Sequence, residues 1–239
     1  MRTTSLLVDD DILIDAGTGL GDLTLEEMAR IRHIFVTHSH LDHIAGIPLM
    51  VDSIFGQIGE PIILHASAET VAALREHIFN WKIWPDFTVL PSAASGVLQY
   101  RVMAPDEVCT VGTRNIRMVP VNHAVPGVAY CIESAGRVAA FSGDTTSNDS
   151  LWAALNAYPD VAALIVECAF PNQEHDLCRK AFHYCPDLLA EDLGKLRHRP
   201  QIYLSHLKPG AEAQIERECR EQIRDFELRR LFGGDLIQL

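Results

Sequence analysis

The chain has 239 residues, enough to bury one substantial hydrophobic core, and this length favours a single domain over residues 1–239. Its 32 acidic residues outnumber its 20 lysines and arginines, and the resulting net charge of −12 disfavours a sequence-independent grip on a long nucleic acid. No apolar run approaches the roughly 18 residues of a membrane span, so we expect neither a long nucleic acid nor a membrane as partner.

The cysteines indicate the redox environment. There are six of them, they form no Cys-x-x-Cys pair, and we expect no signal peptide before them. We therefore expect reduced thiols in a cytoplasmic protein.

The first elements are short. Apolar runs at residues 5–8 and 12–14 flank an aspartate-rich turn and predict a β-hairpin. Thr24 and Glu27 match the capping box that opens a short helix. The Ile, Phe and Val of residues 31–37 then predict a buried strand.

A dense group of polar side chains follows that strand. Residues 38–43 read His-Ser-His-Leu-Asp-His, and so many imidazoles at a strand end must be solvated, paired or bound to a cation. Neutral imidazole and carboxylate are the ligands that zinc, manganese and iron prefer. Asp15, after the hairpin, is either a turn residue or an acceptor that orients one of these histidines. Gly17 and Gly19 allow the backbone to approach the site closely.

The middle of the chain continues with alternating elements. We expect a helix over residues 44–55 with Pro48 in its first turn or as a kink, a strand over 61–65, and a helix capped by Ser67. His65 and His77 lack ligand neighbours and are taken as scaffold residues. The short apolar runs of residues 87–141, separated by glycines, predict an antiparallel second sheet.

Two tryptophans interrupt the helical pattern between these segments. Trp81 and Trp84 lie in an irregular stretch that ends at a proline. They either wall a ligand pocket or cover the core or an oligomer interface, and the sequence favours the second interpretation.

The last part alternates helices and strands. Helices are predicted over residues 151–158 and 174–182, and from Pro186. Strands are predicted over residues 161–166 and 202–204, and Glu167 and His206 follow them. The tail over residues 211–231 is predicted as a helix with one apolar stripe and one solvated, charged face.

These motifs resemble a known family. The hexapeptide at residues 38–43 resembles the HxHxDH signature of the metallo-β-lactamase superfamily, and Val-Asn-His at 121–123, Phe-Ser-Gly-Asp-Thr at 141–145 and Leu-Ser-His at 204–206 follow in the expected order. The resemblance implies an α+β fold, a four-layer αββα sandwich of two mixed β-sheets flanked by helices. Members usually carry a further strand and a glycine-rich loop before the hairpin, and whether that strand is missing here is left open.

The resemblance also implies a set of metal ligands. It assigns His38, His40 and His123 to one divalent ion, assigns Asp42, His43 and His206 to another, and lets Asp144 bridge them. Zinc is favoured, with manganese or iron as alternatives, and each ion keeps a position open for catalysis.

Two more residues indicate the chemistry. Glu167 and His183 lie where phosphodiesterase branches of the superfamily, including ribonuclease Z, carry a glutamate and a histidine, and with Asp42 they are the candidate catalytic residues. Residues 165–172 and 203–210 look like class II cyclic nucleotide phosphodiesterases in particular, although Pro48 and the residues after it depart from that class's stricter signature. A hydroxide bridging the two ions would attack phosphorus, and His183, oriented by Glu167, would protonate the departing alkoxide.

The expected function is hydrolysis of a small 3′,5′-cyclic nucleotide, with cyclic AMP favoured, to the 5′-monophosphate. The alternatives are a ribonuclease Z-like endoribonuclease, a thioester or lactone hydrolase of the same superfamily, and a nucleotide-binding protein without turnover. A homodimer is left open as the assembly.

Overall fold

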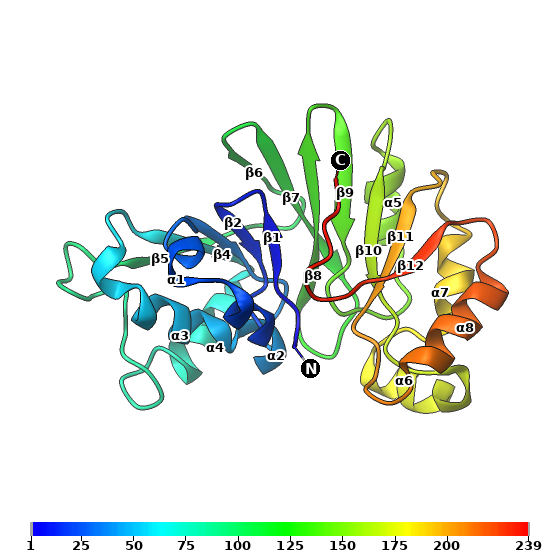
Figure 1. The fold of residues 1–239 in the computed structure, drawn as a ribbon, viewed down its shortest axis with the longest axis horizontal. Coiled ribbons are helices and arrows are strands. Elements are labelled where there is room, and N and C mark those ends of the chain that lie inside the picture. Colours follow the sequence, from blue (N-terminus) through cyan, green and yellow to red (C-terminus); the bar gives the residue numbers. More distant parts are fainter. Residues whose placement is uncertain (1, 239) are drawn as a thin grey trace. The chain divides into compact units, whose positions relative to one another are not determined.

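The computed structural model describes residues 2–238, which divide into two compact units after Ala104. Each unit holds one β-sheet and the helices that cover it (Figure 1). The single domain expected over residues 1–239 stays a prediction.

The first unit is built on a five-stranded sheet in the order β1-β2-β3-β4-β5. Its strands are β1 Leu6–Val8, β2 Ile12–Ile14, β3 His33–Phe35, β4 Ile62–Ala66 and β5 Leu98–Val102. The predicted hairpin is confirmed, because β1 and β2 pair antiparallel with Leu6 opposite Ile14. The other neighbouring strands of this sheet run parallel.

Helices connect and cover these strands. They are η1 Thr18–Asp22, α1 Leu25–Met28, α2 Leu41–Ile44, α3 Gly46–Ser53, η2 Phe55–Gln57 and α4 Ala68–His77. The capping box of Thr24 and Glu27 and the Ser67 cap are both formed. Pro48 lies in the first turn of α3, where its missing N–H is tolerated. Apolar side chains of α3 and α4 pack with those of the strands in one buried core.

The second unit is built on a seven-stranded sheet in the order β12-β11-β10-β9-β8-β7-β6. Its strands are β6 Val108–Val111, β7 Arg114–Val121, β8 Gly127–Ser134, β9 Arg137–Phe141, β10 Ala163–Glu167, β11 Gln201–Ser205 and β12 Leu228–Arg230. Strands β6 to β9 pair antiparallel, whereas β9 to β12 pair parallel. Both sheets are therefore mixed, as predicted.

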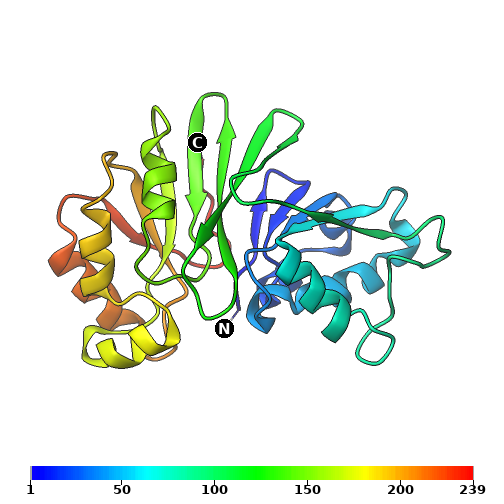
Figure 2. The ribbon, with the colours of Figure 1, turned by 180° about the vertical axis from the view of Figure 1, so that it is seen from behind.

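The helices of the second unit lie between its later strands in sequence. They are α5 Ser150–Asn156, η3 Asn172–Glu174, α6 His175–Ala181, α7 Pro186–Leu193 and α8 Glu212–Gln222. Figure 2 shows α5 lying against the face of the sheet, and α5, α7 and α8 share a buried core with strands β7 to β12. Pro186 begins α7, as its fixed φ favours.

Two predicted elements were wrong in part. Residues 98–102 of the segment assigned to the second sheet form β5, which pairs parallel with β4 in the first sheet, because the intervening α4 makes a crossover connection. The tail helix ends at Gln222, and residues 228–230 form β12. Ile223 and Leu228 are buried in the same core as the apolar side chains of α8. Their burial places the segment after α8 at the edge of the sheet, where it forms β12.

The remaining expectations concern thiols and membrane spans. All six cysteines are buried and free. No helix within residues 2–238 is long and apolar enough to cross a bilayer.

Candidate metal and catalytic site

The first unit presents a histidine loop, residues 38–43, which follows β3 and runs into α2. The His38 ring centroid lies 4.6 Å from that of His40 and 4.2 Å from that of His43, and both His38 and His43 are fully buried. Asp42 lies beside them, with Oδ2 3.7 Å from Nε2 of His43 and its side chain 40% exposed. The four ligands predicted for this loop therefore gather in one place.

Asp15 fixes the orientation of this loop. Its fully buried carboxylate accepts hydrogen bonds from the Thr37 amide at 2.8 Å, the Thr37 hydroxyl at 2.8 Å and Nδ1 of His43 at 2.6 Å. Of the two roles considered for Asp15, the structure therefore favours the acceptor. Because His43 donates from Nδ1, its Nε2 carries the lone pair that binds a metal.

Thr37 orients a second histidine, a role that the sequence analysis missed. Its hydroxyl lies 3.0 Å from Nδ1 of His38. Since the hydroxyl proton is already directed at Asp15, the oxygen accepts from His38, which leaves Nε2 of His38 as the ligand atom. The only sequence signal for this role is the position of Thr37 between strand and loop.

The backbone of residues 16–17 packs closely against the histidine loop, and glycines make this approach possible. A Cβ on Gly17 would lie 2.0 Å from the carbonyl oxygen of Asp42, so only glycine fits there. The Ala16 amide donates to the His43 carbonyl at 2.7 Å, and the Gly46 amide donates to the Ala16 carbonyl at 2.7 Å. The close backbone approach predicted at this turn is thus confirmed for Gly17.

The second unit presents another cluster, of which four members lie at or just beyond the ends of strands and one, His183, follows α6. It consists of His123, Asp144, Glu167, His183 and His206. Asp144 is 3% exposed, and its Oδ2 lies 3.2 Å from Nε2 of His206. Ligand atoms of Asp144 and His123 lie within 4.8 Å of one another, as do those of Glu167, His183 and His206.

Glu167 and His183 form a buried pair in this cluster. Oε1 of Glu167, which has no solvent exposure, lies 2.6 Å from Nδ1 of His183. The same carboxylate accepts the amides of Thr145, Ala169 and Tyr184, which fix it in place. Burial lowers the pKa of His183, but the charge and hydrogen bond of Glu167, helped by Asp144, outweigh burial and raise it above its ordinary value.

A backbone carbonyl orients His123. Nδ1 of His123 donates to the carbonyl oxygen of Phe182 at 3.0 Å, where α6 has ended in a left-handed residue with φ +58°. His206 also has a left-handed backbone, with φ +57°. Such conformations are costly for residues other than glycine and cluster at functional sites. Nothing in the sequence signals Phe182, because glycine is the residue expected there.

The donor chemistry of both clusters fits divalent metal ions. Nδ1 of His43 and of His123 is bonded to an oxygen acceptor, which is the arrangement that prepares Nε2 for a metal. The carboxylates of Asp42 and Asp144 lie among these histidines, and no cysteine of residues 2–238 belongs to either cluster. Nitrogen and oxygen donors without sulfur fit zinc, manganese or iron.

His65 and His77, which were expected to be scaffold residues, lie in neither cluster. His65 is buried, and its Nε2 lies 2.9 Å from Nδ1 of His33. Burial and the positive charges of His33 and Arg101 lower the pKa of His65 to about 3. His77 is exposed at the end of α4.

The two tryptophans differ. Trp84 is partly buried against the core of the first unit, whereas Trp81 is 61% exposed. The interpretation of core cover therefore holds for Trp84 only.

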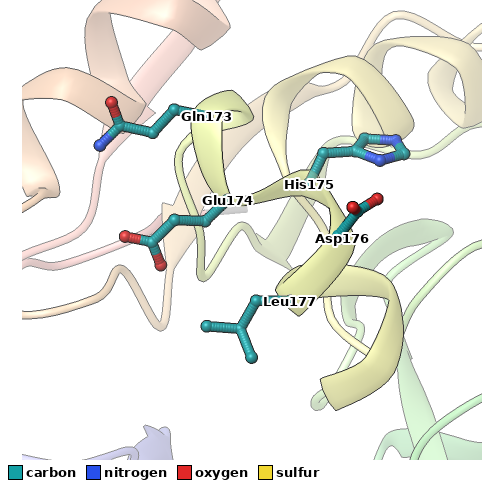
Figure 3. A pocket seen from close by; sticks show the side chains of 5 residues that line it. All are labelled: Gln173, Glu174, His175, Asp176 and Leu177. Atoms are coloured by element: carbon teal, nitrogen blue, oxygen red, sulfur yellow. The ribbon is translucent and has the colours of Figure 1, made fainter.

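A surface hollow of about 480 Å³ lies on η3 and the start of α6, lined by residues 173–177. Figure 3 shows that its side chains project in different directions instead of converging, and none of them is a predicted site residue. The residues that line this hollow belong to neither of the clusters described above.

Comparison with known proteins identifies the family. Residues 10–207 match the family model described as a beta-lactamase superfamily domain. The chain is 29% identical over 208 residues to a probable 3′,5′-cyclic-nucleotide phosphodiesterase of Yersinia pestis. That match covers 75% of this chain but only 57% of the relative.

Solved structures share the fold. The metallo-beta-lactamase fold protein YhfI of Bacillus subtilis superimposes with a TM-score of 0.76 at 16% identity, covering 96% of this chain and 88% of YhfI. Unliganded yeast PDE1 also gives a TM-score of 0.76, at 23% identity, covering 87% of this chain and 69% of that structure. The predicted fold is confirmed, and the chain belongs to the beta-lactamase superfamily, with a metallo-β-lactamase fold.

Proposed function

We propose that the protein is a metal-dependent phosphodiesterase that hydrolyses a 3′,5′-cyclic nucleotide, cyclic AMP in the first place, to the 5′-monophosphate. The observation that carries this proposal is the buried Glu167–His183 pair, whose members lie within 4.8 Å of a predicted metal ligand, His206. A thioester or lactone hydrolase needs no such pair. The name of the Yersinia pestis relative supports the same substrate class.

The proposed cofactor is a pair of divalent ions, zinc in the first place. His38, His40, Asp42, His43, His123, Asp144 and His206 are the proposed ligands. When bound, such ions neutralise charge on the phosphoryl oxygens and activate water. The supporting observation is the preparation of Nε2 on His43 and His123 by acceptors at Nδ1.

The chain's own contribution is a positioned proton. Glu167 holds Nδ1 of His183, so that the opposite nitrogen, Nε2, is the atom that can donate a proton to the departing oxygen of the sugar. Four hydrogen bonds to the Glu167 carboxylate keep this pair rigid, which general acid catalysis requires. Asp42, whose carboxylate is partly exposed, is proposed as both ligand and catalytic residue.

A substrate panel tests the proposal. Purified protein is incubated with Zn²⁺ or Mn²⁺ and with cyclic AMP, cyclic GMP, bis(p-nitrophenyl) phosphate, precursor tRNA or a thioester. We expect turnover of the cyclic nucleotides and of the nitrophenyl diester. Turnover confined to tRNA or to the thioester would overturn the proposal in favour of the corresponding alternative, and nucleotide binding without turnover would identify a binding protein.

Two further proposals concern the localisation and the assembly of the protein. We place the protein in the cytoplasm, for which six free, buried thiols are the support. A homodimer is the proposed assembly, which light scattering of the purified protein tests.

A further inference from the structure

Two segments run side by side beyond β10, whose last residue is Glu167, and β11, which His206 follows. Strands β10 and β11 are parallel neighbours, with Glu167 opposite Ser205. Past the strand ends the Lys208 amide donates to the carbonyl of Ala169 at 2.9 Å, so the two segments stay fixed to each other. The backbone position of Lys208 is therefore fixed relative to the segment that directly follows Glu167.

The Lys208 side chain is held in place by an aromatic ring. Its Nζ lies 5.2 Å from the centre of the Phe170 ring, within the range of a cation–π interaction. Phe170 is only 6% exposed, and its ring centroid lies 5.8 Å from that of His183. His183 in turn stacks on His206 with centroids 5.2 Å apart. Packed rings thus connect an exposed ammonium group to the catalytic pair.

Lys208 has a distinctive position among the basic residues. Of all the lysines and arginines in the sequence, only Lys208 lies within two positions of a predicted metal or catalytic residue. Within residues 2–238 no carboxylate forms an ion pair with it. The ammonium charge of Lys208 is therefore available to a ligand. The neighbouring cluster of the second unit, in contrast, consists of imidazoles and carboxylates.

We propose that Lys208 binds the phosphoryl anion of the nucleotide, with Phe170 holding its ammonium group at the site. This inference rests on the proposed function, because it names how the same site takes an anionic ester. A lysine supplies a mobile point charge that matches a phosphate oxygen, and the aromatic face restricts its motion without neutralising it. The residue contributes to affinity for the substrate and not to the chemical step.

The test compares Lys208→Met, which keeps the apolar stem, with Lys208→Arg, which keeps the charge. Lys180→Met, at an exposed lysine in the last turn of α6, is the matched control. Cyclic AMP hydrolysis gives KM and kcat, and calorimetry of each metal-loaded protein with AMP, the product of the proposed reaction, gives a dissociation constant that does not depend on turnover. Thermal unfolding monitored by circular dichroism checks that the variants fold.

We expect Lys208→Met to raise KM and the AMP dissociation constant by about tenfold or more, as for the loss of one charge-assisted contact, with kcat changed by less than about threefold. Lys208→Arg should restore most of the affinity, and Lys180→Met should match the wild type. If the wild type hydrolyses cyclic AMP and Lys208→Met binds it equally well, the inference is wrong and the proposed function stands. If the wild type neither hydrolyses a diester nor binds AMP, both fall.

Discussion

In three histidines of the candidate site a hydrogen bond fixes one ring nitrogen, Nδ1. Asp15 accepts from Nδ1 of His43, and the Phe182 carbonyl accepts from Nδ1 of His123. Glu167 accepts from Nδ1 of His183 at 2.6 Å in the same way. In all three rings the partner of Nδ1 thus leaves Nε2 as the acting nitrogen, which we propose as metal ligand in His43 and His123 and as proton donor in His183.

Replacement of His183 tests the proton donor. We expect His183→Ala to slow the hydrolysis of cyclic AMP by about 10²–10⁴-fold while the metal content is retained, because the alkoxide then departs without a proton. The loss should be smaller for bis(p-nitrophenyl) phosphate, whose leaving group needs no acid. Equal losses for the two substrates would remove the assignment, and His77→Ala, at an exposed histidine, serves as the control.

Replacement of Asp144 tests the metal ligands. Asp144→Ala removes a buried carboxylate that lies 3.2 Å from His206 and within reach of His123. We expect the variant to lose its activity and part of its metal, measured by elemental analysis of dialysed protein. Asp160→Ala, at an exposed aspartate of the same unit, should keep both. Full metal occupancy in Asp144→Ala would contradict its role as a ligand.

At the scale of elements, a close backbone contact supports the histidine loop. A methyl group at position 17 would meet the carbonyl oxygen of Asp42 at 2.0 Å, so the turn or the loop must shift. We expect Gly17→Ala to destabilise the protein by about 1–3 kcal/mol and to lower metal affinity. Denaturant unfolding and metal titration measure the two effects. Gly56→Ala, where a Cβ meets nothing within 4 Å, should show neither.

A buried carboxylate joins three segments of the second unit. Asp192 of α7 is 1% exposed and accepts from Trp152 of α5, from Tyr184 and from Ser147. Burial raises the pKa of Asp192, but the bonds from Lys195, Tyr184 and Ser147 outweigh burial and lower it below the ordinary value. The charged form of Asp192 therefore stabilises the fold.

This linkage has a defined pH dependence. We expect Asp192→Asn to lower the free energy of unfolding at pH 7 by about 3 kcal/mol. Because the folded pKa is lowered, the contribution is complete above the unfolded pKa of about 4 and is lost as the pH falls through the folded pKa. The difference between wild type and variant should narrow below about pH 4 in urea titrations. A constant difference down to pH 2 would contradict this account.

The sequence predicted most elements because their signals are local. The capping box at Thr24, the Ser67 cap and Pro186 at a helix start each act within one turn of chain. The sheet to which residues 98–102 belong, and the return of residues 228–230 to a sheet edge, depend on packing between distant segments. Short apolar runs carry no such information. The metal motifs were found because each is a short local pattern. The roles of Thr37 and of the Phe182 carbonyl were missed because they depend on contacts that the pattern does not encode.

For the whole molecule, the proposed ligands are distributed over both units. Four precede Ala104 and three follow it. Ions that bind only the folded protein stabilise it by about 2.7 kcal/mol at a hundredfold excess over the dissociation constant. We expect dialysis against a chelator to lower the thermal unfolding midpoint, and added Zn²⁺ to restore it. An unchanged midpoint in protein shown to have lost its metal would contradict ligation by these residues.

The left-handed backbone at Asp15, Phe182 and His206 has a consequence for protein engineering. A designer seeking thermostability would replace such residues with glycine, which adopts this conformation without steric penalty. At Asp15 and His206 that exchange would remove an acceptor or a proposed ligand. A higher thermal unfolding midpoint there would be obtained at the expense of the proposed activity, so stabilising substitutions should begin at other positions.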